Sequence, residues 1–338
     1  MSRKISHSLI NGRAGAGTGG QGLKVEWDST NDGELHWKDV DESSLEYVAP
    51  AFQGTNYGFT AGGNASGTDS NVIDRFAFSS NTTATDWGDM TEGRISIAGH
   101  SSSTDGFISG DHNDGAGTFN SIDKFSFSSS AGASDHGDLT RDRETPSGAS
   151  SATHGFSSTG HGGGSGYTTT IDKFAFSSNT TASSHGDLTY STYQGVGNSA
   201  TDYGFASGGC SGCVSTINKF AFASNTTASG HGDLARSGRL QSGQSSTDDG
   251  FVAGGLSGST WSSIDKFSFT SNTTAAGHGD LSSARHQPAG QSSTTDGFAS
   301  GGTTNINTID KFAFSSNTTA ADHGDLSVAR GGGAGSQY

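Results

Sequence analysis

Large apolar side chains and long hydrophobic runs are scarce in this sequence. Only 29% of its 338 residues are hydrophobic, whereas 54 residues are glycine. So low an apolar content is typical of disordered chains, whose hydrophobic surface cannot offset the entropy lost on folding. The longest apolar runs fall well short of the 18 or more residues that cross a bilayer, so we expect no membrane insertion. The N-terminus lacks the apolar core of a secretion signal, and we expect none there.

Basic residues are also few. The chain has 18 Lys and Arg against 33 Asp and Glu, which gives a formal net charge of -15. Binding to nucleic acid independent of sequence requires a basic surface that displaces counterions from phosphate. The charge balance therefore predicts no nucleic-acid partner, and it favours solubility with little non-specific adhesion.

Cysteine occurs only twice, as Cys210 and Cys213 in an isolated C-x-x-C. A structural zinc needs about four ligands, and no second pair exists. The redox motif of this spacing belongs in a βαβ unit, which the sequence does not suggest. We therefore expect either free thiols or a local disulfide in one loop, and we expect no cofactor.

What the sequence does contain is repetition. The hexapeptide Ile-Asp-Lys-Phe-Ala-Phe, or a close variant, recurs at intervals of 49, 49, 46, 47 and 45 residues. A Gly-Phe dipeptide precedes each copy and a Gly-Asp-Leu or Gly-Asp-Met follows it, so nearly all 20 phenylalanines are periodic. The copies of the hexapeptide begin at Ile73, Ile122, Ile171, Ile217, Ile264 and Ile309.

Each repeat is interpreted as four short strands. In the fifth repeat the segments are 242–246, 251–255, 264–269 and the residues around 278–281. The third segment alternates apolar and polar residues as a half-buried strand does, and turns rich in Gly, Asp and Asn separate the segments. Small residues dominate the first segment, which suits the crowded axis of a ring. Four antiparallel strands per unit of this length are typical of a propeller blade.

We therefore predict an all-β chain with a single β-propeller of four-stranded blades. Residues 1–22 form a Gly-rich attachment segment and residues 23–338 form the propeller. A single blade buries too little surface to be stable alone, so neighbouring blades must stabilise one another. The six repeats lie near 51–98, 99–147, 148–196, 197–242, 243–289 and 290–334.

The two ends of the chain suggest how the ring closes. The C-terminal residues 330–338 repeat the first segment of a further unit and then stop. Residues 24–27 resemble a third segment, and residues 36–40 resemble a fourth. We favour seven blades, with a composite blade made from both ends that hides the open edges. The alternative is six blades with a separate N-terminal hairpin.

With its strands placed, the unit resembles the kelch repeat. Glycine pairs such as Gly62-Gly63 end the second segment in four repeats, and Ile-Asp-Lys-Phe supplies the next strand. Kelch blades also carry an arginine after the fourth strand. The kelch tryptophan is present only as Trp87, and histidine replaces it in the other repeats. The resemblance implies a propeller but no particular partner. The matching arginines are Arg94, Arg143, Arg285 and Arg330.

In composition the chain also resembles kelch-like repeat proteins of tailed bacteriophages from aquatic bacteria. That resemblance implies a non-enzymatic virion protein at the particle surface or tail, such as a tail fibre, a receptor-binding protein or a capsid decoration. The implied partners are other virion proteins, bound through the N-terminal segment, and a host surface glycan or protein. Multiple copies or a homo-oligomer would be expected. The alternatives are an extracellular lectin-like propeller and a carbohydrate-active enzyme.

Two sets of repeated residues resemble metal-binding or catalytic groups, but a structural role explains them better. A residue found at the same place in every blade is usually used for packing or to cap a turn. We therefore expect neither a metal site nor a catalytic site from them. The Asn-x-Thr turns, such as the one at Asn81, are likewise interpreted as turns. The first set is Trp87, His136, His185, His231, His278 and His323. The second set is Asp74, Asp123, Asp172, Asp265 and Asp310, with Asn218 as the exception.

Function should then lie where the blades differ, in the loops between the second and third segments. An enzyme would need a reactive group that breaks the repeat, and none stands out. Aromatic residues on variable loops commonly contact sugars or proteins, although such loops also vary without function. The candidate ligand contacts are Trp261, Tyr167, Phe119 and His112. The loops span 64–71, 111–120, 161–170, 210–216, 256–263 and 303–308.

Overall fold

The computed structural model divides into two compact units, Met1–Val48 and Ala49–Tyr338. In the first unit, β1 (Lys24–Trp27) pairs with β2 (Leu35–Lys38) in an antiparallel hairpin. The described residues contain no helix that could cross a membrane. The structure describes residues 24–27, 35–38, 53–113, 117–162, 166–303 and 306–338.

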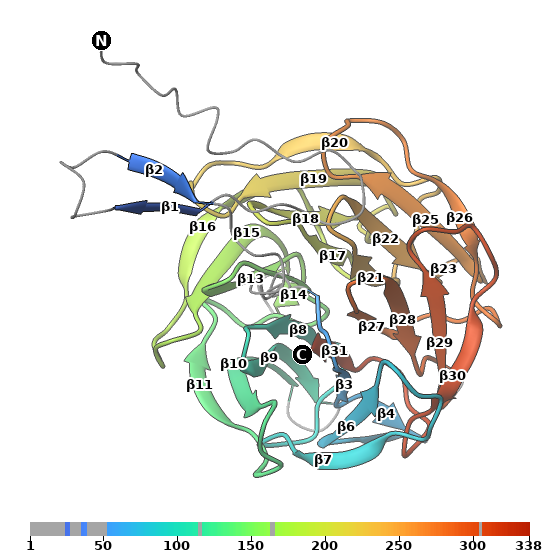
Figure 1. Ribbon diagram of the computed structural model, residues 1–338. Coiled ribbons are helices and arrows are strands. Elements are labelled where there is room, and N and C mark those ends of the chain that lie inside the picture. The colour runs from blue at the N-terminus through green and yellow to red at the C-terminus, as the bar shows by residue number, and fades with distance from the viewer. Residues whose placement is uncertain (1–23, 28–34, 39–52, 114–116, 163–165, 304–305) are drawn as a thin grey trace. The chain divides into compact units, whose positions relative to one another are not determined.

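The second unit is a β-propeller of antiparallel four-stranded blades, as the repeats predict (Figure 1). Its described residues form six blades, numbered here in the chain order of the repeated hexapeptide. From blade 1 to blade 6, the innermost strands are β31 (Ala334–Gln337), β8 (Ala98–Ser101), β12 (Ser147–Ser150), β17 (Val196–Ser199), β21 (Ser242–Ser245) and β27 (Ala289–Ser292). The second strands are β3 (Tyr57–Ala61), β9 (Asp105–Asn113), β13 (His154–Ser158), β18 (Tyr203–Ser207), β22 (Asp249–Ala253) and β28 (Asp296–Ser300).

The outer half of each blade contains the repeated hexapeptide and the Gly-Asp motif. The third strands are β6 (Val72–Ala77), β10 (Gly117–Ser126), β15 (Gly166–Ala175), β19 (Thr216–Ala221), β25 (Ser263–Ser268) and β29 (Thr308–Ala313). The fourth strands are β7 (Thr85–Asp89), β11 (Ser134–Asp138), β16 (Ser183–Thr192), β20 (Ser229–Asp233), β26 (Ala276–Asp280) and β30 (Ala321–Asp325). Short strands in the intervening loops are β4 (Asn64–Ala65), β5 (Thr68–Asp69), β14 (His161–Gly162), β23 (Leu256–Ser257) and β24 (Ser259–Thr260).

The C-terminal strand closes the ring by completing blade 1. Strand β31 pairs with β3, so that Ser336 lies opposite Phe59, and the Tyr338 N–H donates to the Tyr57 carbonyl at 2.8 Å. The prediction of a seventh, composite blade is therefore wrong, and the six-bladed alternative is confirmed. The first repeat supplies only the second to fourth strands of its blade, and the C-terminal segment fills the innermost place. This pairing covers edges that would otherwise stay open.

The hydrophobic core is divided among the junctions between blades. The phenylalanine of each Gly-Phe motif stacks on the last phenylalanine of the next blade's hexapeptide, with ring centroids 4.5–4.9 Å apart. Each junction therefore buries aromatic surface from two blades, which explains why a chain with few apolar residues can fold. The stacked pairs are Phe59–Phe127, Phe107–Phe176, Phe156–Phe222, Phe205–Phe269, Phe251–Phe314 and Phe298–Phe78.

The glycine of each Gly-Phe motif makes room for an aromatic ring of its own blade. A Cβ on Gly58 would overlap the ring of Phe76, the first phenylalanine of the hexapeptide on the neighbouring strand. The same overlap would occur in every blade. The recurrence of Gly-Phe together with Phe-x-Phe thus reflects one packing arrangement made six times.

A second ring of glycines surrounds the axis. The second residue of every innermost strand is glycine, and a Cβ there would overlap the carbonyl oxygen of the equivalent residue on the adjacent innermost strand. The prediction that small residues occupy the crowded axis therefore has a specific steric cause. This axial glycine ring consists of Gly99, Gly148, Gly197, Gly243, Gly290 and Gly335.

Candidate functional site

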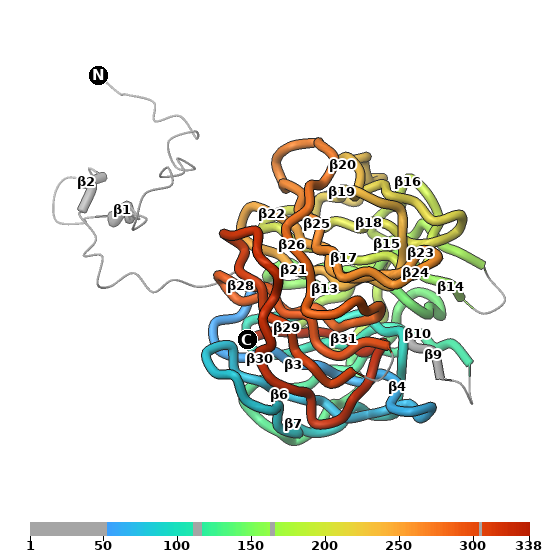
Figure 2. Tube along the Cα trace, turned by 90° about the vertical axis from the view of Figure 1, so that its right-hand side faces the viewer, coloured from blue at the N-terminus to red at the C-terminus, as the bar shows by residue number. Residues whose placement is uncertain are grey.

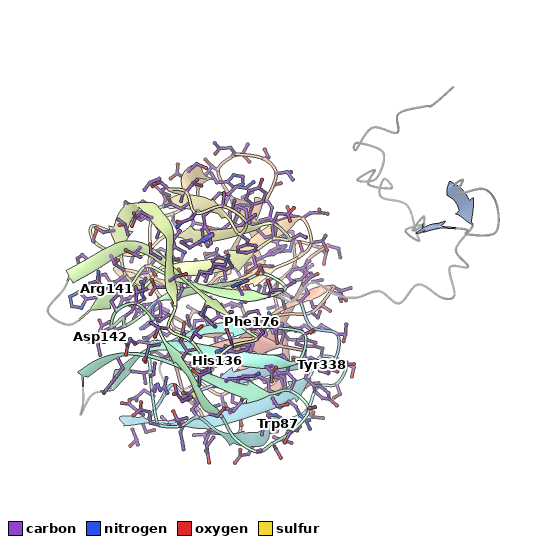
Figure 3. The ribbon with its side chains drawn as sticks, turned by 90° about the vertical axis from the view of Figure 1, so that its left-hand side faces the viewer. Trp87, His136, Arg141, Asp142, Phe176 and Tyr338 are labelled. Atoms are coloured by element: carbon purple, nitrogen blue, oxygen red, sulfur yellow. A yellow bond between two sulfur atoms is a disulfide. The ribbon has the colours of Figure 1, made fainter. Side chains whose placement is uncertain are left out.

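The repeated histidines join neighbouring blades. In each case Nε2 donates a hydrogen bond, 2.8–2.9 Å long, to the backbone carbonyl between the two phenylalanines of the next blade. The Trp87 Nε1–H makes the same bond to the Ser126 carbonyl at 2.9 Å. Figure 3 shows Trp87 and His136 in successive blades. Burial lowers the pKa of His185 and His231, which favours their neutral form. The donors and acceptors are His136 to Ala175, His185 to Ala221, His231 to Ser268, His278 to Ala313 and His323 to Ala77.

The repeated aspartates make a second set of junction contacts. Each buried carboxylate accepts the N–H that follows the Leu or Met of the preceding blade, at 2.8–3.2 Å, and Asn218 accepts in the same way. No three His, Cys, Asp or Glu side chains group as a metal site would, within the residues that the structure describes. The acceptors are Asp74, Asp123, Asp172, Asn218, Asp265 and Asp310, and their donors are Ser327, Thr91, Thr140, Thr189, Ala235 and Ser282.

At four of the six junctions an arginine pairs with this aspartate. Both side chains are at most 1% exposed, and the N–O distances are 2.6–3.0 Å. Burial lowers the pKa of Arg285, but the negative charge of Asp310 opposes this effect and favours the ionised pair. The pairs are Arg94–Asp123, Arg143–Asp172, Arg285–Asp310 and Arg330–Asp74.

The junction between blades 3 and 4 replaces this ion pair with neutral groups. Thr192 stands in place of the arginine and Asn218 in place of the aspartate. The Tyr190 hydroxyl lies 2.9 Å from the Thr216 carbonyl and 3.3 Å from the Gly208 carbonyl. In two other junctions the guanidinium of Arg143 or of Arg285 donates hydrogen bonds to the equivalent carbonyls. Burial raises the pKa of Tyr190 to about 12, so the hydroxyl keeps its proton.

The junction between blades 4 and 5 keeps the aspartate but lacks the arginine. Gly238 stands in its place, and a Cβ there would overlap the ring of Trp261. The Arg236 guanidinium lies 5.1 Å from the centre of that ring, and its positive charge favours the ionised form of Asp265. Burial nevertheless raises the pKa of Asp265. Trp261, predicted as a ligand contact, therefore packs into the space beside this junction.

The variable loops and the segments leading into the innermost strands meet on one face, here called the loop face. Backbone bridges join them at Glu144 with His161, and at Arg239 with Leu256. The described ends of these loops, including β4, β14 and β24, lie on the right in Figure 2. A ligand on this face would meet residues from both kinds of segment.

The chain enters the propeller on the opposite face. The Gly54 N–H donates to the Ser292 carbonyl at 2.8 Å, and the Gln53 side chain donates to the Ser245 carbonyl at 3.2 Å. Ser245 and Ser292 are the last residues of their innermost strands, whereas the loop face lies at the first residues. The loop face is thus turned away from the point where the chain joins the propeller.

A closed ring of six backbone hydrogen bonds surrounds the axis at the loop face. Each N–H donates to the equivalent carbonyl of the preceding blade at 2.7–3.3 Å. All six residues have φ between 50° and 79°, and five are not glycine, although L-residues rarely adopt this region. We call this ring the collar. Its members are Ser96, Thr145, Gln194, Leu240, Gln287 and Gly332.

The residues immediately before the collar are different in every blade. They form what we call the variable circle, and all but the glycine are partly exposed. The junction residues are nearly identical from blade to blade, whereas the variable circle mixes apolar, acidic, aromatic and basic side chains. The chemical differences between blades are therefore found on the loop face. The members are Ile95, Glu144, Tyr193, Arg239, His286 and Gly331.

Three small cavities follow the axis from the collar inward, with volumes of about 70, 120 and 50 Å³. The collar and the residues just after it line the first cavity, whereas residues of the innermost strands contribute to the second and line the third. His100 is the titratable residue that lines the third. The His100 Nδ1–H donates to the Ala149 carbonyl at 3.1 Å, and Nε2 lies 2.8 Å from the Ser109 hydroxyl. Complete burial lowers the pKa of His100 to about 4.

Stability should therefore decrease in mild acid. Because the folded-state pKa of His100 is below its unfolded value, its contribution is complete above pH 6.5 and is lost as the pH falls towards 4. The loss should reach about 3 kcal/mol, from 1.36 kcal/mol per pKa unit. His100→Gln should remove this part of the pH dependence, since Gln244 and Gln291 occupy the equivalent place in blades 5 and 6. Urea unfolding of both proteins between pH 7 and pH 4 measures the difference, and parallel pH profiles would contradict it.

The four predicted ligand contacts lie in blades 2, 3 and 5. Tyr167 is 45% exposed at the start of β15. Phe119 lies in β10, partly buried, and its carbonyl accepts the Arg143 N–H at 3.1 Å. His112 lies in β9, and its side chain is outside the described residues. Of the described candidates, Tyr167 thus offers the most exposed aromatic surface.

Sequence reasoning missed the variable circle because it considered only the loops between second and third segments. Tyr193 stacks on Tyr167 with ring centroids 4.9 Å apart and an angle of 8° between planes. Arg239 donates to the Tyr193 hydroxyl at 3.4 Å and to the Gln194 side-chain oxygen at 3.0 Å. The available signal was the diversity of the position after the arginine in otherwise similar repeats.

No family model matches the sequence, and no curated protein matches it. The identification of a β-propeller therefore depends on the strand arrangement.

Proposed function

We propose that this chain is a non-enzymatic binding propeller that is held through its N-terminal segment and recognises its partner with the loop face. The observation that carries the proposal is the variable circle on the face opposite the point of chain entry. A protein held from that side leaves this face accessible. The repeated His, Asp and Arg side chains are engaged in blade junctions, which accounts for them without catalysis.

We further propose that the protein belongs to a virion, as a tail-associated or surface component of a tailed phage present in several copies. This part depends on the compositional resemblance to phage repeat proteins. The glycine pairs and the buried arginines, such as Arg94, support a kelch-like assignment of the blades. Immuno-electron microscopy of intact particles tests the location, and an antibody that never labels particles would refute it.

The binding role is tested by blocking one face at a time. Ser257→Cys, exposed on the loop face, and Thr270→Cys, exposed on a turn of the opposite face, would each be coupled to a polyethylene glycol maleimide. Cys210 and Cys213 are paired in a disulfide, so the new thiol is labelled selectively. With the protein immobilised through its N-terminus, the label at Ser257→Cys should abolish binding to host cells and to a glycan array. The label at Thr270→Cys should leave binding unchanged.

Loss of binding with both labels, or with the Thr270→Cys label alone, would place recognition elsewhere. An unlabelled protein that binds neither cells nor glycans would contradict the binding role.

A further inference from the structure

One sector of the loop face, at blades 3 to 5, combines an aromatic platform with a cation. Tyr167 and Tyr193 stack nearly parallel, and the His161 ring lies 5.3 Å from that of Tyr167. Tyr167 remains 45% exposed, although its ring contacts both of these residues. A flat, exposed aromatic ring held in place by a second ring suits the apolar face of a sugar ring.

The neighbouring cation is Arg239. Among the described residues its guanidinium donates hydrogen bonds only to neutral groups, the Tyr193 hydroxyl and the Gln194 amide oxygen. No ion pair to a carboxylate is found for it among the described residues, in a chain with a net charge of -15. The buried arginines such as Arg285 are neutralised by aspartate, so Arg239 is chemically different from them. A guanidinium of this kind favours a carboxylate ligand, because it can donate two parallel hydrogen bonds.

A local covalent constraint holds the platform. The Cys210 N–H donates to the Tyr193 carbonyl at 2.9 Å, and the Ser211 hydroxyl donates to the Ser191 carbonyl at 2.9 Å. Both donors lie in the turn closed by the Cys210–Cys213 disulfide. The segment that carries Tyr193 is therefore fixed by a feature found in blade 4 alone, and a fixed platform loses less entropy when a ligand binds.

We propose that Tyr167, Tyr193 and Arg239 form a binding subsite for a carboxylate-bearing sugar ring of an acidic glycan. The sugar ring packs on Tyr167, and its carboxylate accepts hydrogen bonds from Arg239. The inference rests on the proposed function and specifies the ligand class for the loop face. Glu144, the acidic member of the variable circle, lies on the side of Tyr193 away from Arg239, in the preceding blade.

The test uses the full chain on a glycan array that carries uronic-acid and sialic-acid glycans beside their carboxyl-reduced forms. Carboxylated glycans should bind at least about tenfold more tightly than the reduced forms, as expected of a charge-assisted pair. Tyr167→Ala should weaken binding about tenfold for both forms, and Arg239→Gln should remove the preference for carboxylate. Tyr203→Ala is the matched control, because Tyr203 is 40% exposed at the start of β18, on the opposite face.

Equal binding of the two forms would overturn the assignment of an acidic sugar. Binding that survives Tyr167→Ala but is blocked by the label at Ser257→Cys would overturn this subsite while the proposed function stands. Absence of binding to every glycan and to host cells would refute both. Circular dichroism of each variant shows whether the fold is intact.

Discussion

Gly197→Ala is expected to lower the free energy of unfolding by about 3 kcal/mol, the upper part of the range for overpacked cores. A Cβ at this position would overlap the backbone of Gly148 on the adjacent innermost strand. Backbone atoms cannot relieve the overlap by changing rotamer as a side chain can, so the two blades must move apart. Because the blades form a closed ring, that movement also displaces the other blades. Urea unfolding followed by fluorescence measures the effect.

The matched control is Gly277→Ala, on the fourth strand of blade 5. A Cβ there meets no atom within 4 Å, and the residue is exposed. We expect a change within about 0.5 kcal/mol, as is usual for exposed substitutions. If both variants were equally stable, close approach of the innermost strands would not limit what this position tolerates.

Arg285→Met should destabilise the propeller by about 3–5 kcal/mol, because it leaves the Asp310 carboxylate buried without its cation. Both side chains are fully buried, with Arg285 Nη2 2.6 Å from an oxygen of Asp310. Lys266→Met is the comparison: its partner Asp249 lies 3.0 Å away, but the pair is partly exposed at 35% and 23%. Removing such a pair should cost about 0–1 kcal/mol. Thermal and urea unfolding distinguish the two variants.

The protein itself supplies a compensating design for this junction. The neutral junction of blades 3 and 4 suggests the combination Ser283→Tyr, Arg285→Thr and Asp310→Asn, which copies Tyr190, Thr192 and Asn218. We expect the triple variant to recover most of the stability lost in Arg285→Met, since no charge remains buried and the two carbonyls regain a donor. A triple variant no more stable than Arg285→Met would show that the tyrosine cannot replace the guanidinium.

The architecture of a blade could be predicted because each structural role recurs in the sequence. Gly58 and Phe76, for example, recur with their neighbours in every repeat, and one steric requirement explains both residues. The closing strand was harder to predict. Residues 334–337 have the pattern of an innermost strand. An innermost strand can pair with the edge of any second strand, so the pattern does not specify which second strand is the partner.

The candidate site was only partly predictable for a related reason. Tyr190 substitutes for an arginine that would stand two residues later, and only the fold brings its hydroxyl to the same carbonyls. Trp261 was predicted as a ligand contact because it is aromatic and lies on a variable loop. Its actual place, over Gly238, follows from the loss of an arginine side chain in the preceding blade. Such exchanges across blades are not visible in either repeat alone.

The unequal junctions also affect how the chain avoids misassembly. Near-identical repeats can pair in the wrong order or with another copy, as repeat proteins tend to do. A blade that carries Asn218 offers no carboxylate to an arginine from a foreign blade, and Trp261 fills the space that such an arginine would need beside blade 5. The first mismatch leaves an uncompensated buried charge, which costs several kcal/mol, and the second forces a steric overlap. Two consecutive exceptional junctions therefore define the position of blades 3, 4 and 5 in the ring and favour the correct order of otherwise interchangeable units.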